Sequence, residues 1–385
     1  MSLFLPPEIL DLIIDHLYDD PTALKTCCIA SKSWVPRART QLFAEVEFCS
    51  KSTPIESWTT AFPDPSNSPA HHARSLSVGA CSFYTTASMD VRPWICSFRH
   101  VTKLRVYTIW YDDSQVYLTQ LQGFSPVLES LSLIYSAIPT SEIFDLVCSF
   151  PSLNDLSLVS LTDEETKGGW AIPSTSPKFT GQLVLRMGSG IRSDVRRLLD
   201  LPGGLHFSSI SITSPVRDVG SIADLILRCS GTLESLWIIY YDPGMFPWLK
   251  RLICALSLPV DSEPYEVPPP LDLSKATRLE DVEFLLNTQT IQWITDTLRS
   301  AKSGHLQQIA ITVSPSFTSL VRATAVQEWE GLDHLLVQLW TSRSICPMLK
   351  YAETQKRDDL KTLVRVLLPE ATNRGIIDVV ESQRR

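Results

Sequence analysis

Apolar and polar positions between residues 43 and 320 follow one pattern that recurs about every 27 residues. Each copy holds an apolar residue, two variable residues, a second apolar residue, one variable residue and a third apolar residue. First positions are 25 to 30 residues apart, except for one interval of 46 residues. The copies begin at Phe43, Ala73, Val101, Leu128, Leu153, Thr180, Phe207, Leu233, Leu279 and Leu306, of which Ala73 and Thr180 are weak first positions.

Alternation at the second and third apolar positions predicts a short strand in each copy, with both side chains on one face. Between strands, apolar residues at helical spacing predict return helices at 141–147, 195–201, 221–228 and 289–298. A single repeat cannot cover its own apolar face, so neighbouring repeats must stack. The sequence therefore predicts an α/β solenoid with a curved parallel sheet on one side and helices or loops on the other.

Two stretches interrupt the array. Gly168-Gly169 and the segment 173–177, which is rich in proline and serine, predict a loop in place of a helix. The 46-residue interval holds the proline-rich segment 259–270, so we expect a loop insertion around 259–273. An extra short repeat at Ile253-Leu256-Leu258 is the alternative for this interval.

Beyond residue 320 the period changes. The pattern predicts a helix over 325–340, a weak strand within 347–354, a helix over 356–368 and a terminal strand over 375–380. Residues 321–385 would then form a cap over the open end of the array, whose apolar face would otherwise meet water.

Residues 1–42 show helical rather than repeat spacing. Pro6 and Pro7 suit a first helical turn, and apolar residues follow at three- and four-residue steps as far as Leu17. Asp19-Asp20-Pro21 ends this helix before a second one. About 40 residues bury too little surface to fold unaided, and apolar side chains occupy more than one face. We therefore expect a partner to cover them.

The order Leu-Pro-x-Glu-Ile-Leu, Ile-Ile-x-x-Leu and Leu-x-x-Cys-x-x-Ala-x-x-x-Trp resembles the F-box in the version common among fungal F-box proteins. Lys32-Ser33 departs from the Cys-Arg that many members carry before the tryptophan. The repeats resemble irregular leucine-rich repeats. The resemblance implies that this segment docks on the Skp adaptor of a cullin–RING (SCF) ubiquitin ligase. The residues implied to contact the adaptor are Leu5, Pro6, Ile9, Leu10, Ile13, Leu17, Leu24, Cys27 and Trp34.

The implied function is a non-enzymatic substrate receptor that binds a target protein through the repeat array. A scaffold that uses the same modules outside a ligase is the alternative, as is a plain capping role for the N-terminal helices. Because tyrosine and tryptophan dominate interface hot spots, aromatic residues in or after strands are the candidate target contacts, although each could instead fill the core. They are Tyr107, Trp110, Tyr111, Tyr135, Trp237, Tyr240 and Tyr241.

Composition narrows the function further. A net charge of −8 with scattered basic residues argues against nucleic-acid binding, and no apolar run reaches 18 residues, so no membrane segment is expected. Nine cysteines without a Cys-x-x-Cys pair indicate neither a disulfide framework nor a zinc site. These features, with no signal-peptide pattern at the start, predict a protein of the cytoplasm, the nucleus or both.

Motifs for catalysis are missing from the sequence. It has no phosphate-binding glycine loop, no Gly-x-Ser-x-Gly elbow and no His-Glu-x-x-His helix, so we expect no enzyme activity and no cofactor. His71 and His72 are adjacent, and in a strand or turn their rings should point apart, which disfavours a shared metal.

Overall fold

The computed structural model of the 385-residue chain describes residues 6–48, 55–79, 92–107, 114–135, 140–160, 173–187, 191–215, 219–241, 269–286, 290–313, 326–343, 345–351 and 357–381. The chain divides into two compact units. Unit 1 comprises Met1–Val159 with Glu164–Lys178, and unit 2 comprises Ser160–Asp163 with Phe179–Arg385.

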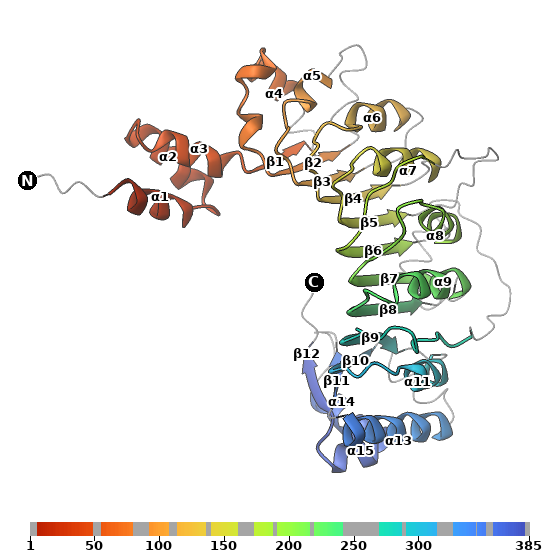
Figure 1. Ribbon diagram of the computed structural model, residues 1–385. Coiled ribbons are helices and arrows are strands. Elements are labelled where there is room, and N and C mark those ends of the chain that lie inside the picture. Colours follow the sequence, from red (N-terminus) through yellow and green to blue (C-terminus); the bar gives the residue numbers. More distant parts are fainter. Residues whose placement is uncertain are drawn as a thin grey trace, which may run out of the picture. The chain divides into compact units, whose positions relative to one another are not determined.

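Unit 1 begins with three helices and continues with strands that alternate with helices (Figure 1). Its elements are α1 (Pro7–Asp15), α2 (Pro21–Ala30), α3 (Val35–Leu42), β1 (Glu45–Phe48), α4 (Ile55–Ala61), η1 (Pro65–Asn67), η2 (Pro69–His72), β2 (Ser75–Gly79), α5 (Arg92–Ile95), β3 (Lys103–Tyr107), α6 (Ser114–Leu121), β4 (Ser130–Tyr135), α7 (Thr140–Cys148) and β5 (Asp155–Ser160). The five strands lie in the sheet in chain order.

Unit 2 continues the same alternation and ends in a group of helices. Its elements are β6 (Gln182–Met187), α8 (Ile191–Leu199), β7 (Ser209–Pro215), α9 (Val219–Cys229), β8 (Ser235–Tyr241), β9 (Asp281–Leu286), α11 (Ile291–Ser300), β10 (Gln308–Val313), α13 (Val326–Arg343), β11 (Cys346–Tyr351), α14 (Arg357–Leu367), α15 (Pro369–Asn373) and β12 (Asp378–Glu381). These strands also follow chain order in an open sheet.

The predicted apolar pairs form the interior. In unit 1, Leu76 lies opposite Val46 and Leu104, in parallel pairing. In unit 2, Leu236 lies opposite Ile210 and Val282. All six side chains are at most 8% exposed. The expected α/β solenoid similar to leucine-rich repeats is therefore confirmed.

A backbone carbonyl before eight of the described strands accepts two hydrogen bonds from the next repeat. The Ala44 carbonyl accepts from the amides of Arg74 (2.8 Å) and Ser75 (3.0 Å), and the Arg74 carbonyl accepts from Thr102 (2.9 Å) and Lys103 (3.1 Å). The same arrangement recurs at Thr102, Glu129, Gly181, Ser208, Glu234 and Glu280. This repeated contact holds each strand in register with its neighbour, so the buried pairs stay aligned.

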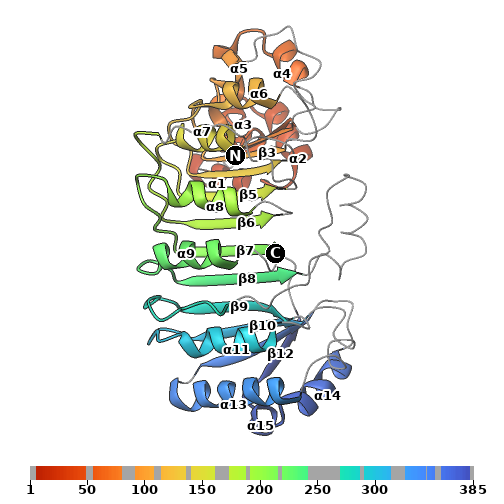
Figure 2. The same ribbon diagram turned by 90° about the vertical axis from the view of Figure 1, so that its right-hand side faces the viewer.

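The predicted return helices are present as α7, α8, α9 and α11. In unit 2, α8, α9 and α11 lie along one face of the sheet (Figures 1 and 2). Buried phenylalanines fill the space beneath the repeats: Phe179 stacks on Phe207 with ring centroids 5.0 Å apart, and Phe124 meets Phe150 edge-on at 5.9 Å. The opposite face of the sheet, called the free face below, carries the residues that alternate with the buried pairs.

The predicted interruptions also have a structural outcome. Residues 173–181 contain no helix or extended strand, as expected for that part of the loop, and Gly168-Gly169 lies outside the described residues. β8 pairs directly with β9 across the 46-residue interval, and residues 269–280 contain neither helix nor strand. Most of the expected insertion at 259–273 and the alternative repeat at 253–258 lie outside the described residues, so both stay predictions.

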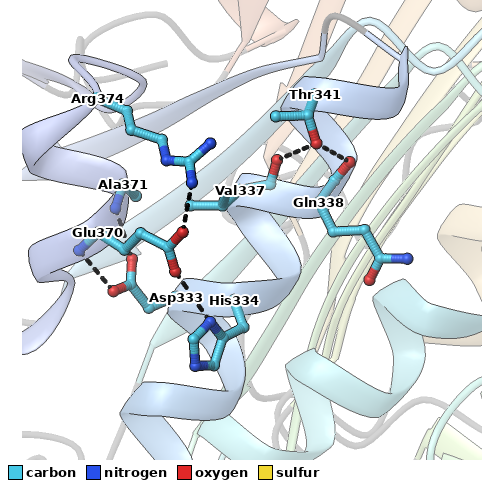
Figure 3. Close-up of polar contacts among 8 residues, drawn as sticks. All are labelled: Asp333, His334, Val337, Gln338, Thr341, Glu370, Ala371 and Arg374. Atoms are coloured by element: carbon cyan, nitrogen blue, oxygen red, sulfur yellow. Dashed lines mark hydrogen bonds and ion pairs between the residues drawn. The ribbon is translucent and has the colours of Figure 1, made fainter.

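The C-terminal segment packs around α13, whose bounds are close to those of the helix predicted over 325–340. Asp333 of α13, only 4% exposed, accepts hydrogen bonds from the backbone amides of Glu370 (2.8 Å) and Ala371 (2.9 Å), as Figure 3 shows. Glu370 in turn contacts His334 Nδ1 (2.9 Å) and Arg374 Nη2 (2.8 Å). Asp333 thus supplies acceptors that the first turn of α15 lacks within its own helix.

We expect Asp333→Ala to lower the free energy of unfolding by about 1 to 3 kcal/mol, because two amide donors lose their acceptor in a buried place. Urea unfolding followed by circular dichroism measures the loss. Glu330→Ala, on the exposed side of the same helix, is the matched control and should change stability little. Equal effects of the two substitutions would contradict the capping role of Asp333.

Candidate functional site

The N-terminal module, α1 to α3, is built by local signals. Pro7 occupies the first turn of α1, with Glu8 beside it near the positive helix end. Asp20 caps α2 by accepting hydrogen bonds from the amides of Thr22 (3.0 Å) and Ala23 (2.9 Å). The proline in the first turn of α1 and the Asp20 cap of α2 explain why the two short helices begin where they do.

A small hydrophobic core holds the three helices together. Ile14 of α1, Leu24 and Cys27 of α2 and Ala38 of α3 are buried in it. Four partly buried residues pack against this core: Leu17, Cys28, Trp34 and Leu42. Every helix contributes to the cluster, so the module has an interior of its own, although a very small one.

A polar contact joins α1 to α3. Both carboxylate oxygens of Asp15 accept hydrogen bonds from the Arg37 guanidinium, Nε at 2.6 Å, and Gln41 Nε2 donates to Oδ1 at 2.6 Å. The hydrogen bond from Arg37 lowers the pKa of Asp15 below its usual value near 3.8, against the opposing effect of burial, with help from Gln41. Since these contacts favour the charged carboxylate, they stabilise the packing of α1 on α3.

The outer side of α1 is apolar and open to solvent. Ile9, Leu12 and Ile13 are 42%, 56% and 48% exposed, whereas Ile14 is 2% exposed. Two further large apolar side chains of the module, Tyr18 and Ile29, are 70% and 86% exposed. α1 therefore has two apolar faces, one in the module core and one that no described part of the chain covers.

The residues predicted to bind an adaptor separate into two groups. Pro6, Ile9 and Ile13 lie on the surface, and Leu10 is half-buried. Leu17, Leu24, Cys27 and Trp34 build or flank the core, and Leu5 lies outside the described residues. Sequence spacing missed Leu12, Tyr18 and Ile29 as exposed candidates, because only tertiary packing decides which apolar face of a helix stays open.

The aromatic candidates for target binding are only partly described. Tyr107 is half-buried at the end of β3, where its hydroxyl accepts a hydrogen bond from Arg105 Nη1 at 3.4 Å. Trp237 is half-buried on the free face of β8, as its alternation with Leu236 and Ile238 predicts, and its buried Nε1 has no hydrogen-bond partner among the described residues. Tyr135, Tyr240 and Tyr241 belong to β4 and β8, but nothing is described of their side chains. Trp110 and Tyr111 lie outside the described residues.

Two cysteine thiols and the possible metal ligands were the remaining candidates for chemistry in the described residues. Burial raises the pKa of the Cys148 and Cys229 thiols to about 11, with a small further contribution from Asp145 for Cys148, so both are protonated and weakly nucleophilic at neutral pH. Within the described ranges, no three His, Cys, Asp or Glu side chains are grouped to hold a metal ion.

The expectation that His71 and His72 point apart is wrong. Both belong to the 3-10 helix η2 rather than a strand, and their ring centroids are 3.9 Å apart. His71 Nδ1 lies 3.1 Å from the Ser68 carbonyl, and His72 Nδ1 lies 3.3 Å from the Thr40 hydroxyl of α3. The pair therefore makes local contacts that tie η2 to α3.

Among the described helices, none combines the length and the apolar character that a membrane span requires. No known protein family and no curated protein matches the sequence. Among solved structures, the chain is similar to one from the crystal structure of the Rad7 and Elc1 complex in yeast. That match has a TM-score of 0.38 and 11% sequence identity, covering 90% of this chain and 88% of the other.

We expect the Asp15 contact to make the module sensitive to acid. Because the folded-state pKa is lowered, its contribution to stability is present above about pH 3.8 and is lost as the pH falls through the folded pKa. The melting temperature of wild type should exceed that of Asp15→Asn near neutral pH, and this difference should shrink on acidification. Asp19→Asn, at an exposed position, is the control; a difference independent of pH would contradict the ion pair.

Proposed function

We propose that the chain is the substrate-recognition subunit of an SCF-type ubiquitin ligase. In this role, α1 to α3 act as an F-box that docks on the Skp-type adaptor, and the repeat array binds a target protein. The observation that carries the proposal is the uncovered apolar face of α1, formed by Ile9, Leu12 and Ile13. The F-box-like order of residues in the same segment supports it.

The exposed face can supply binding energy without being needed for folding. Completing the burial of three aliphatic side chains that are about half exposed is worth roughly 1 kcal/mol each, or about 3 kcal/mol together. Tyr18 and Ile29 offer further apolar surface on the same module. Association also costs translational and rotational freedom, so docking must engage most of these side chains at once.

A capping role for these helices fits the burial less well. A cap would turn its apolar side chains toward the array, whereas Ile9, Leu12 and Ile13 stay exposed, and the buried residues pack within the module itself. The separation of an inner from an outer apolar face is what a docking module requires.

No catalytic group in this chain is needed for the proposed role, because ubiquitin transfer would be carried out by other subunits. The alternative function is a scaffold that uses the same two modules outside a ligase. Co-purification of cullin distinguishes the two functions. A substrate receptor co-purifies with both the adaptor and cullin, whereas a scaffold does not co-purify with cullin.

We expect Ile9→Asp with Ile13→Asp to reduce capture of the Skp adaptor at least about tenfold, because docking would then bury two unpaired charges. Affinity purification of the full chain, with the adaptor quantified by immunoblotting, measures the effect. Asp11→Ala, on an exposed position of the same helix, is the matched control and should retain the adaptor.

The double variant should keep the melting temperature of wild type, because both positions are exposed. Leu24→Ala, by contrast, should lower stability as well as capture, since Leu24 is 1% exposed in the module core. Adaptor capture that is unchanged in a folded Ile9→Asp/Ile13→Asp protein would remove the docking claim.

A further inference from the structure

The free face of unit 1 carries two matching rows of side chains across β1 to β4. In the pairing register, the first row reads Glu45, Ser75, Lys103 and Ser130. The second row, two residues further along each strand, reads Glu47, Ser77, Arg105 and Ser132. Each row thus places a carboxylate on β1, a cation on β3 and small hydroxyl residues on β2 and β4.

These charged side chains have almost no partners within the described part of the chain. Glu45, Glu47, Lys103 and Arg105 are all exposed. Among the described contacts, the only side-chain hydrogen bond of the four is that of Arg105 to Tyr107, and no ion pair joins the β1 carboxylates to the β3 cations. Nearby charges are Arg74, which contacts the His100 carbonyl, and Asp155 at the start of β5.

In unit 2, a carboxylate and a cation that lie two strands apart do form an ion pair. Glu283 of β9 and Lys350 of β11 are also two strands apart, and Lys350 Nζ lies 2.7 Å from Glu283 Oε2. Thr312 of the intervening β10 donates a hydrogen bond to Glu283 Oε1 at 2.7 Å. Both charged side chains are only about one-fifth exposed. The rows of unit 1 have the same two-strand separation but remain open.

We propose that a segment of the target protein docks on the free face of β1 to β4. Each charge of this segment is opposite in sign to the charged side chains that it covers. The segment places acidic side chains over Lys103 and Arg105 and a basic side chain over Glu45 and Glu47. Two strand spacings are about 10 Å, a length between the spans of two and four residues of extended chain, and side chains an even number of positions apart point to the same face. The fitting segment therefore carries a basic and an acidic residue two or four positions apart.

Charge complementarity is suited to selecting such a segment. Exposed ion pairs are individually weak, but an arrangement of opposite charges sets orientation, rejects reversed partners and speeds encounter. The serines between the charged residues are small, so they leave space for a chain lying across the strands. This inference rests on the proposed function, in which the array binds a target, and it specifies the chemistry of that target.

Selection of a phage-displayed library of random twelve-residue peptides on the purified full chain tests the inference. We expect enriched peptides with a Lys or Arg two or four positions from an Asp or Glu. Binding of these peptides should fall at least tenfold in Lys103→Glu/Arg105→Glu. Arg99→Glu/Lys178→Glu, which reverses two exposed basic residues of unit 1 outside the rows, is the matched control and should bind as wild type does.

Reversing both rows sharpens the test. The quadruple variant with Glu45→Lys, Glu47→Lys, Lys103→Glu and Arg105→Glu again has opposite charges on β1 and β3, so it should recover binding of the enriched peptides that the double variant loses. A selection without this charge spacing, an empty selection, or equal binding to wild type and the double variant would overturn the inference. Adaptor capture should be unaffected by these substitutions, so its loss in Ile9→Asp/Ile13→Asp remains a separate measure of the proposed function.

Discussion

The array depends on one constraint: a repeat of about 27 residues cannot enclose its own apolar strand residues and must share them with its neighbours. The carbonyl before each of eight described strands meets this constraint by accepting two amides from the following repeat, as Ala44 and Arg74 do. Because that contact recurs in both units, the second and third apolar positions of successive repeats stay opposite one another. The free face is then left with evenly spaced rows of variable side chains, suited to recognition.

The N-terminal module is likewise too small to enclose all of its apolar side chains. Its interior is limited to Ile14, Leu24, Cys27, Ala38 and the side chains that pack on them, and the Asp15–Arg37 ion pair adds a polar tie. So small a core leaves the outer side of α1 without a cover. An apolar face that folding does not use, on a module with its own interior, is the physical basis for proposing a docking partner.

The repeat architecture could be predicted from the sequence because the two-residue alternation of the strands recurs at the period of the repeat. Alternation within each strand, repeated about every 27 residues, identifies buried pairs such as Leu104 and Val106 without any tertiary information. β11 and β12 were also expected, but their apolar pattern is weaker. The loop around residues 173–181 followed directly from its prolines and serines.

Features that depend on contacts between distant residues could not be predicted. Asp15 reads as a solvent-exposed acid until α3 brings Arg37 to it. Leu24 and Cys27 fit a contact motif in sequence, yet packing places them in the core. The charged rows of unit 1 became visible only with the pairing register, which aligns residues 28 or more positions apart.

The central claim is that a separate protein covers the outer face of α1. Hydrogen–deuterium exchange of the full chain, with and without a purified Skp-type adaptor, tests it most directly. The account predicts slower exchange in residues 7–15 when the adaptor is added, with the strands of unit 2 unchanged. Exchange in α1 that is the same with and without saturating adaptor would contradict it.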